Sequence, residues 1–177
     1  MNKKISVKKS VRYLTLTAML VAMSVVIGIF CKSVLNFGGG LFRITFENFP
    51  IILAGITLGP LTGGVVGAAS DLVSYLLSPQ VYPPNLIVTL GAFFIGVISG
   101  IVAKYVVKKR CTLQIAISGG TAHVIGSMII KSIGLYTFYG WAVLWRVPMY
   151  LVIASFEVII ICLLFKNSAF RKLTEEL

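Results

Sequence analysis

Acidic residues are scarce in this chain. Only 5 of its 177 residues are Asp or Glu, and charged residues of both signs amount to 12%, whereas soluble domains carry about 25%. No polar stretch is long enough for a soluble domain, and no Gly-x-x-x-x-Gly-Lys-Ser/Thr phosphate-binding loop occurs. The chain therefore has neither the composition of a soluble domain nor the motif of a P-loop ATPase.

Long apolar runs replace the missing charge. Hydrophobic residues make up 58% of the chain, the mean hydropathy is +0.97, and several runs reach the length of about 20 residues that a helix needs to cross a bilayer. The composition predicts an all-α integral membrane protein with a single membrane domain over residues 1–177. The first run starts like a signal peptide but is longer than a signal core and lacks a clear cleavage site, so we interpret it as a retained helix.

Cysteine and histidine are equally rare. The 3 cysteines, Cys31, Cys111 and Cys162, are scattered and odd in number, so neither a disulfide framework nor a metal site is indicated. The single histidine, His123, lies in an apolar segment, where a hydrogen-bonded core role is favoured over metal ligation. Ser118 and His123 on one helix lack the geometry of a catalytic dyad, so we do not expect an enzyme.

The basic residues set the expected topology. A net charge of +11 would suit a nucleic-acid-binding protein, but the cations flank the apolar runs, so we expect contacts with a lipid bilayer and no nucleic acid. Short basic segments stay in the cytoplasm, so both termini are expected there. All but four of the 16 cations form three clusters: Lys3, Lys4, Lys8, Lys9 and Arg12; Lys104, Lys108, Lys109 and Arg110; and Lys166, Arg171 and Lys172.

A bundle of six transmembrane helices satisfies this topology. The second and third helices are separated at Gly59-Pro60, since a proline biases the preceding residue away from helix. Both are short, and short helices interrupted by Gly and Pro often flank a solvated cavity. We expect the six helices at about residues 13–35, 46–59, 61–77, 85–107, 113–136 and 141–165.

Four cations lie at the opposite ends of the apolar runs, against the positive-inside bias: Lys32, Arg43, Lys131 and Arg146. They either line an outward-facing pocket for an anion or extend to the outer lipid headgroups. Lys131 and Arg146 lie a turn or more inside their helices, where a cation is costly unless it is paired or solvated. That position favours a functional role for these two.

Three carboxylates lie at or within the membrane: Glu47, Asp71 and Glu157. Such a carboxylate is a functional candidate by default, although it can also pair with a cation inside the bundle. Asp71, in a short helix, is the strongest candidate for ligand recognition. Glu157 lies deeper toward the cytoplasm, where a structural pairing or a partner contact fits better. Glu47 and Asn48 begin the second helix and either line a pocket or cap the helix.

Aromatic residues gather near the same outer face. An interfacial aromatic belt explains most of them. Trp145 differs because it adjoins Arg146, which would offer a stacking surface and a cation to a flat acidic ligand, although adjacent residues diverge by about 100° on a helix. We include Tyr82, Tyr139 and Trp145 among the candidate ligand-binding residues.

Small residues recur at four-residue spacing in three of the expected helices. The pairs are Ala18 and Ala22, Gly64 and Ala68, and Gly96 and Gly100. This spacing allows helices to approach closely and is usually a packing feature.

Two segments carry a resemblance to a known family: Phe46-Glu-Asn-Phe-Pro-Ile-Ile-Leu-Ala-Gly-Ile-Thr-Leu-Gly-Pro60 and Tyr82-Pro-Pro-Asn85. With the six expected helices and the Ala18-x-x-x-Ala22 pattern, they resemble the substrate-binding S components of energy-coupling-factor (ECF) vitamin transporters over nearly the whole chain. The segment between Arg43 and Asn85 looks most like folate-specific members. Members specific for pantothenate, hydroxymethylpyrimidine or a queuosine precursor share similar sequences.

The resemblance implies a membrane-embedded binding protein of the prokaryotic plasma membrane that captures folate or a related vitamin at the outer face. A membrane-embedded coupling subunit and two cytoplasmic ATPases would drive transport, and no cofactor is expected. In that family the Ala-x-x-x-Ala helix meets the coupling subunit, which assigns Ala18 and Ala22 to that interface.

Folate itself suggests roles for the candidates, since it joins a glutamate tail with two carboxylates to a flat pterin. We hypothesise that its glutamate end binds Arg43, Lys131 and Arg146, and that its pterin binds Asp71 and Asn85. Trp145 or a tyrosine would stack on the ring. A self-contained channel or facilitator is the alternative from another class, because polar and Gly-rich segments line pores as well as pockets; dependence on ATP and partner subunits distinguishes the two.

Overall fold

The computed structural model is an all-helical bundle with one minimal strand pair. It describes residues 2–37, 42–78, 84–106, 112–168 and 170, with the backbone alone for residues 2–9, 37, 42 and 43. The elements in chain order are α1 (Asn2–Val34), β1 (Asn36–Phe37), β2 (Phe42–Arg43), α2 (Asn48–Leu58), α3 (Pro60–Leu77), α4 (Leu86–Ile101), the π-helix η2 (Val102–Val106), α5 (Thr112–Ala122), the π-helix η3 (His123–Lys131), α6 (Ser132–Tyr139), the 3₁₀-helix η4 (Gly140–Trp145) and α7 (Arg146–Lys166). The expected all-α class is confirmed.

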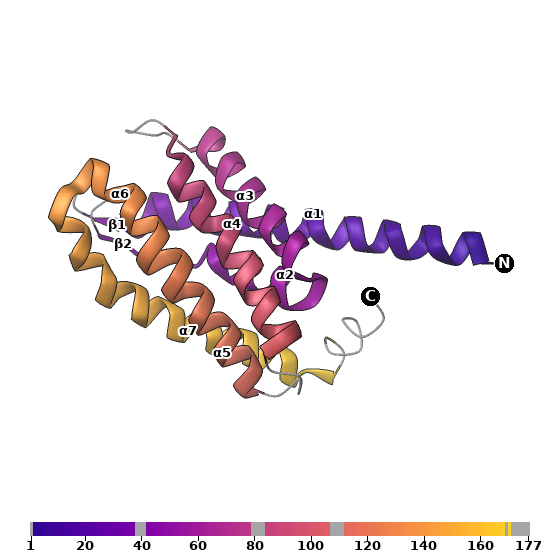
Figure 1. Cartoon of the computed structure of the whole chain (residues 1–177). Helices are drawn as coiled ribbons and strands as arrows, with labels where there is room; N and C mark the ends of the chain where they lie inside the picture. Colours follow the sequence, from indigo (N-terminus) through magenta and orange to yellow (C-terminus); the bar gives the residue numbers. More distant parts are fainter. Residues whose placement is uncertain (1, 38–41, 79–83, 107–111, 169, 171–177) are drawn as a thin grey trace.

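The helix α4 lies at the centre of the bundle (Figure 1). It contacts α2 and α3 on one side and α5, η3 and α6 on the other, while α1 packs on α2 and α3. The N-terminal half of α1 extends beyond the other helices (Figure 1). Pairing between β1 and β2 is antiparallel, with Asn36 opposite Arg43 and Phe37 opposite Phe42.

Within the described ranges, two glycines have a positive φ, and each ends a helix. Gly59 has a φ of 97° and ends α2 directly before Pro60, the first residue of α3, so the helical run breaks at the dipeptide that the sequence indicated. Gly140, with a φ of 55°, ends α6. A side chain at either position would strain the backbone. The long helical stretch Thr112–Lys166 therefore turns back on itself at Gly140, and α7 returns alongside α5 (Figure 1).

Hydropathy and length identify three candidate membrane spans among the described residues. They are Ser10–Val34, Leu86–Val106 and the reversing stretch Thr112–Lys166; α2 is apolar but shorter. The first helix starts at Asn2 and not near residue 13, because the Lys-rich segment contains good helix formers and neither Gly nor Pro. The run expected at 85–107 starts on the N-cap Asn85 and changes to π geometry at Val102.

Small residues bring α2, α3 and α4 into backbone contact. A Cβ atom at Gly96 would lie 2.0 Å from the carbonyl oxygen of Gly63, and one at Gly67 would lie 2.2 Å from that of Ala92. A Cβ atom at Gly100 would lie 2.6 Å from Cα of Pro60, which is also too close. The expected close approach through Gly96 and Gly100 is confirmed. The buried core beside these contacts includes Ile51, Ile52, Val66, Ile95 and Ile161.

Candidate functional site

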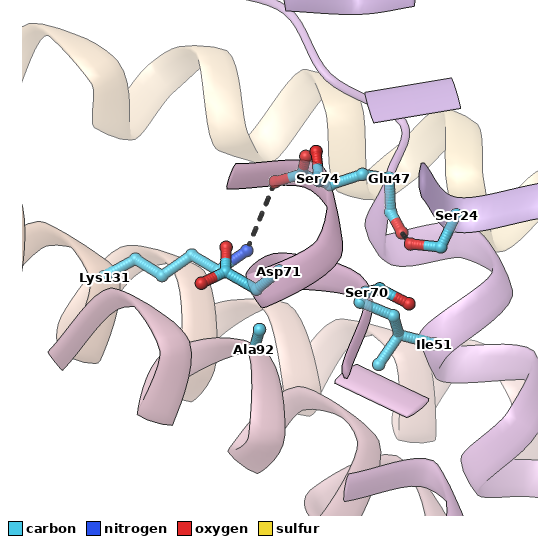
Figure 2. Close-up of a pocket in the computed structure, with 8 residues that line it drawn as sticks. All are labelled: Ser24, Glu47, Ile51, Ser70, Asp71, Ser74, Ala92 and Lys131. Atoms are coloured by element: carbon cyan, nitrogen blue, oxygen red, sulfur yellow. Dashed lines mark hydrogen bonds and ion pairs between the residues drawn. The ribbon is translucent and has the colours of Figure 1, made fainter. Parts of the chain in front are cut away.

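A cavity opens where α1, α2, α3, α4 and η3 meet. It encloses about 200 Å³, including the space at its open side. Five of its side chains carry oxygen acceptors and one carries a cation (Figure 2). The lining residues are Ser24, Glu47, Ile51, Ser70, Asp71, Ser74, Ala92 and Lys131. An acceptor-rich cavity of this kind suits a ligand that donates hydrogen bonds.

Lys131 enters the cavity from the end of the π-helix η3. Its side chain is buried, and its Nζ atom donates to Oδ1 of Asn48 at 3.0 Å and lies 3.6 Å from Oε1 of Glu47. Figure 2 shows the side chain reaching toward Glu47. Room for this side chain comes from Gly91 on α4, where a Cβ atom would lie 2.6 Å from Cγ of Lys131. From the sequence we expected Lys131 to be either paired or solvated, and in the structure it is paired.

Asp71 lies on the α3 wall of the cavity. Thr89 on α4 donates to its Oδ2 at 2.7 Å, leaving the carboxylate partly exposed and able to accept further bonds. One residue earlier, the buried Oγ of Ser70 has no hydrogen-bond partner among the described residues. A turn further on, Ser74 accepts from Nζ of Lys32 at 2.7 Å. Buried polar groups are almost always hydrogen-bonded. The Ser70 hydroxyl is therefore a group on this wall that a ligand could bond.

Glu47 lines the pocket and Asn48 lies behind it, bonded to Lys131. Glu47 precedes α2 but makes no side-chain cap bond. Its backbone carbonyl accepts from Ser24 at 2.7 Å, and its carboxylate faces Lys131. Asn48 contributes by holding Lys131. Of the two roles that the sequence left open, the cap is not formed by the Glu47 side chain, and Glu47 lies at the cavity while Asn48 does not line it.

Arg146 begins α7 and is 5% exposed. Its guanidinium lies 5.8 Å from the ring centres of both Tyr139 and Tyr150. Its buried Nη1 has no hydrogen-bond partner, and no carboxylate among the described residues forms an ion pair with it. A buried, unpaired guanidinium is costly unless an anion arrives, so this position is a candidate anion site separate from the cavity lining.

The remaining sequence candidates lie elsewhere. Asn85 caps α4 by accepting from the amide of Ile87 and donates to the carbonyl of Gly134 at 2.7 Å, so both ends of its side-chain amide serve the backbone. Trp145 is 69% exposed and does not line the cavity. For Arg43 the structure describes the backbone, paired with Asn36, and Tyr82 lies outside the described residues.

Two buried residues outside the cavity, His123 and Glu157, contact each other, and the sequence did not indicate this pairing. Nε2 of His123 contacts Oε2 of Glu157, and both side chains are fully buried. Glu157 Oε1 also accepts from the backbone amide of Phe49 at 3.2 Å. The hydrogen-bonded core role expected for His123 and the structural pairing expected for Glu157 are confirmed. Ser24, Ser70 and Ser74 were missed at the cavity, and so was Thr89, the partner of Asp71; the four-residue spacing of Ser70 and Ser74 beside Asp71 was the available signal.

Three comparisons with known proteins agree with this architecture. A family model for the substrate-specific component of ECF transporters matches residues 12–170. Over 104 residues the chain is 32% identical to the folate transporter FolT of Clostridium novyi (strain NT), and this match spans 58% of the chain and 58% of that relative. Among solved structures, the chain is similar to FolT bound with folic acid, with a TM-score of 0.61 and 25% identity over 92% of each chain. Because the family model covers all but the two ends, the chain belongs to the family of ECF transporter substrate-specific components.

Proposed function

We propose that the protein is the membrane-embedded folate-binding subunit of an ECF-type ABC transporter for folate uptake. The observation that carries the proposal is the cavity in which Asp71, Ser70 and Lys131 meet, in a chain whose family is established and which is similar to FolT bound with folic acid. Substrate binding and orientation are the tasks of such a subunit, so we do not assign it an enzymatic reaction.

The polar groups of the cavity suit the pterin end of folate. A pterin presents an amino group and a ring N–H that can donate side by side to the carboxylate of Asp71, and the Ser70 hydroxyl offers a further partner. Lys131 can donate to the pterin carbonyl. Since Lys131 and Asp71 line the same cavity, they cannot serve opposite ends of an elongated ligand, so we reassign Lys131 from the glutamate end to the pterin end.

Arg146 suits the glutamate end. The carboxylates of Glu47 and Asp71 in the cavity would repel a dicarboxylate, whereas Arg146 has a buried guanidinium nitrogen without a partner. A guanidinium binds a carboxylate with two parallel hydrogen bonds. Tyr139 and Tyr150, which already flank the guanidinium, would keep it oriented. Arg43 and Tyr82 stay proposals from the sequence.

The cavity volume sets a requirement on binding. About 200 Å³ is less than the roughly 300–1,000 Å³ of pockets that enclose drug-sized ligands. Because this volume includes the space between atoms and at the open side, the cavity as it stands is too small for any part of folate. We therefore expect a ligand-bound state in which the helices around the cavity have moved apart relative to this structure.

The membrane arrangement that we propose has six crossings, both termini in the cytoplasm and a multi-pass position in the prokaryotic plasma membrane. The three basic clusters support it. Ala18 and Ala22 are exposed on α1, which supports their assignment to the membrane-embedded coupling subunit. Two cytoplasmic ATPases would then supply the energy of transport.

Calorimetry on the detergent-purified protein tests the proposed substrate. We expect saturable, one-to-one binding of folate below about 1 µM, with a favourable free energy above about 8 kcal/mol. Pantothenate, thiamine, riboflavin, biotin and hydroxymethylpyrimidine serve as competitors. Binding of another vitamin instead of folate would keep the family and replace the substrate. Uptake by proteoliposomes that lack the coupling subunit and the ATPases would favour a self-contained facilitator.

A further inference from the structure

Five buried side chains form a continuous line of contacts from the cavity into the bundle. We call this line the buried polar chain: Lys131, Asn48, Ser127, His123 and Glu157. Its links are Lys131 Nζ to Asn48 Oδ1 at 3.0 Å, Asn48 Nδ2 to Ser127 Oγ at 3.5 Å, Ser127 Oγ to His123 Nδ1 at 3.4 Å, and the contact of His123 Nε2 with Glu157 Oε2. Of these five residues, Lys131 lines the cavity, as does its neighbour Glu47, which is not part of the line.

The first two links settle the orientation of the Asn48 amide. An ammonium group donates and never accepts, so Lys131 must face the carbonyl oxygen of Asn48, as it does. The amide nitrogen then points away from the cavity and donates to Oγ of Ser127. If the Asn48 amide turned over, its NH₂ group would face the ammonium of Lys131, and that link would be lost.

Glu157 ends the buried polar chain, and its carboxylate, when ionised, accepts hydrogen bonds and cannot donate them. Glu157 accepts the backbone amide of Phe49 through Oε1, and thereby supplies α2 with the capping carboxylate that its own N-cap residue does not provide. Its Oε2 faces Nε2 of His123. A proton on Nε2 satisfies this link, which leaves Nδ1 of His123 as the acceptor for the hydroxyl of Ser127.

With Glu157 ionised and the His123 ring neutral, every donor in the buried polar chain points the same way, from Lys131 toward Glu157. Aligned hydrogen bonds polarise and strengthen one another in a low-dielectric interior. The π geometry of η3 matters here because His123, Ser127 and Lys131 all lie on this one segment and all face inward. Such π segments are rare and often occur at functional sites.

We propose that Ser127, His123 and Glu157 are positioning residues for ligand binding. They hold the Asn48 amide in the orientation that keeps Lys131 at the cavity, although none of the three lines the cavity. The inference rests on the proposed function for the identity of the ligand, but the direction of the hydrogen bonds does not depend on it.

The direction of the chain is testable by NMR because His123 is the single histidine. Protein labelled with ¹⁵N-histidine should show two signals from one neutral ring, with the proton on Nε2. A ring protonated on Nδ1 alone, or on both nitrogens, would overturn the proposed direction. This measurement needs no ligand.

The positioning role is testable by removing the middle link of the buried polar chain. Ser127→Ala removes the link between Asn48 and His123, and the matched control is Ser118→Ala. Ser118 is also fully buried on the same helical stretch but donates to the backbone carbonyl of Gln114. Ser127→Ala should weaken folate binding roughly 3- to 10-fold, and Ser118→Ala should change it less than about twofold, with similar thermal stability in both variants.

A ligand-free measurement separates the two proposals. Acylation of Lys131 by an amine-reactive reagent, followed by mass spectrometry, should be several-fold faster in Ser127→Ala than in Ser118→Ala, since Lys131 loses its fixed partner. Equal acylation rates and equal folate affinities in the two variants would reject the positioning role. If the unmodified protein binds no folate, the proposed substrate fails, and the acylation rates together with the NMR signals still decide the positioning role.

Discussion

The helices α3 and α4 meet in two different ways along one antiparallel contact. At Gly63 and Gly96 their backbones touch, with no room for a Cβ atom. About two turns away, Asp71 of α3 and Thr89 of α4 meet through a hydrogen bond beside the cavity. The first region has no room for any side chain at these glycines, and the second places polar side chains beside the cavity. One helix pair thus combines a rigid support with a binding surface, and small substitutions should separate the two functions.

Gly96→Val should have the largest effect. The added side chain would meet the carbonyl of Gly63, and backbone cannot move aside as a flexible side chain can, so we expect a loss of stability of about 3 kcal/mol or more and little folded protein. Thermal unfolding in detergent measures this. Gly120→Ala is the control, because a Cβ atom at Gly120 meets nothing within 4 Å, and it should be neutral or stabilising by up to about 1 kcal/mol.

Arg146→Ala comes next and should affect binding more than folding. Loss of a buried charge pair with the glutamate end of folate would cost roughly 2–5 kcal/mol of binding free energy. Calorimetry with folate measures the loss, and Arg146→Lys should recover part of it. Lys104→Ala, which removes an exposed cation 5.6 Å from the ring centre of Tyr105, serves as the control. Unchanged affinity in Arg146→Ala would reject the anion site.

Asp71→Asn tests the polar end of the α3–α4 contact. The variant keeps an oxygen that can accept from Thr89 but loses the charge that would strengthen the proposed hydrogen bond from the pterin. We expect folate to bind about 1.5–3 kcal/mol more weakly, with thermal stability nearly unchanged. A pterin analogue without the 2-amino group, which keeps only the ring N–H for Asp71, should show a smaller difference between the variant and the unmodified protein than folate does. A loss of the same size for both ligands would argue against the pterin assignment.

Gly91→Ala should produce the smallest of the four effects. The new methyl group would lie 2.6 Å from Cγ of Lys131, a flexible side chain that can shift, and 3.1 Å from the carbonyl oxygen of Gly126. The change should therefore displace Lys131 with only a small backbone shift between α4 and η3. We expect folate affinity to fall by about 1–2 kcal/mol. Gly91 and Gly96 are both tightly packed glycines on α4. The two variants together test whether the first serves ligand binding and the second serves folding. If Gly91→Ala lost as much thermal stability as Gly96→Val, the proposed difference between the two ends of the α3–α4 contact would be rejected.

Much of the fold could be predicted from local features of the sequence. Hydropathy indicated membrane helices, Gly59-Pro60 indicated the break between α2 and α3, and the spacing of Gly96 and Gly100 indicated a close helix contact. The bounds of the first helix were less accurate, because the charge of the Lys-rich start concealed its helical propensity. The orientation of neighbouring residues was not accessible either: Trp145 faces outward and Arg146 inward.

The sequence by itself determined that a few polar residues are embedded in apolar helices, since burial in a membrane makes each of them conspicuous. Only the tertiary structure decided which of them meet. Glu47, Asp71 and Lys131 come from three separate parts of the chain and share one cavity, and His123 finds Glu157 on another helix. The reason is geometric: each turn of helix and each change to π geometry rotates a side chain, so the partners depend on how the helices pack.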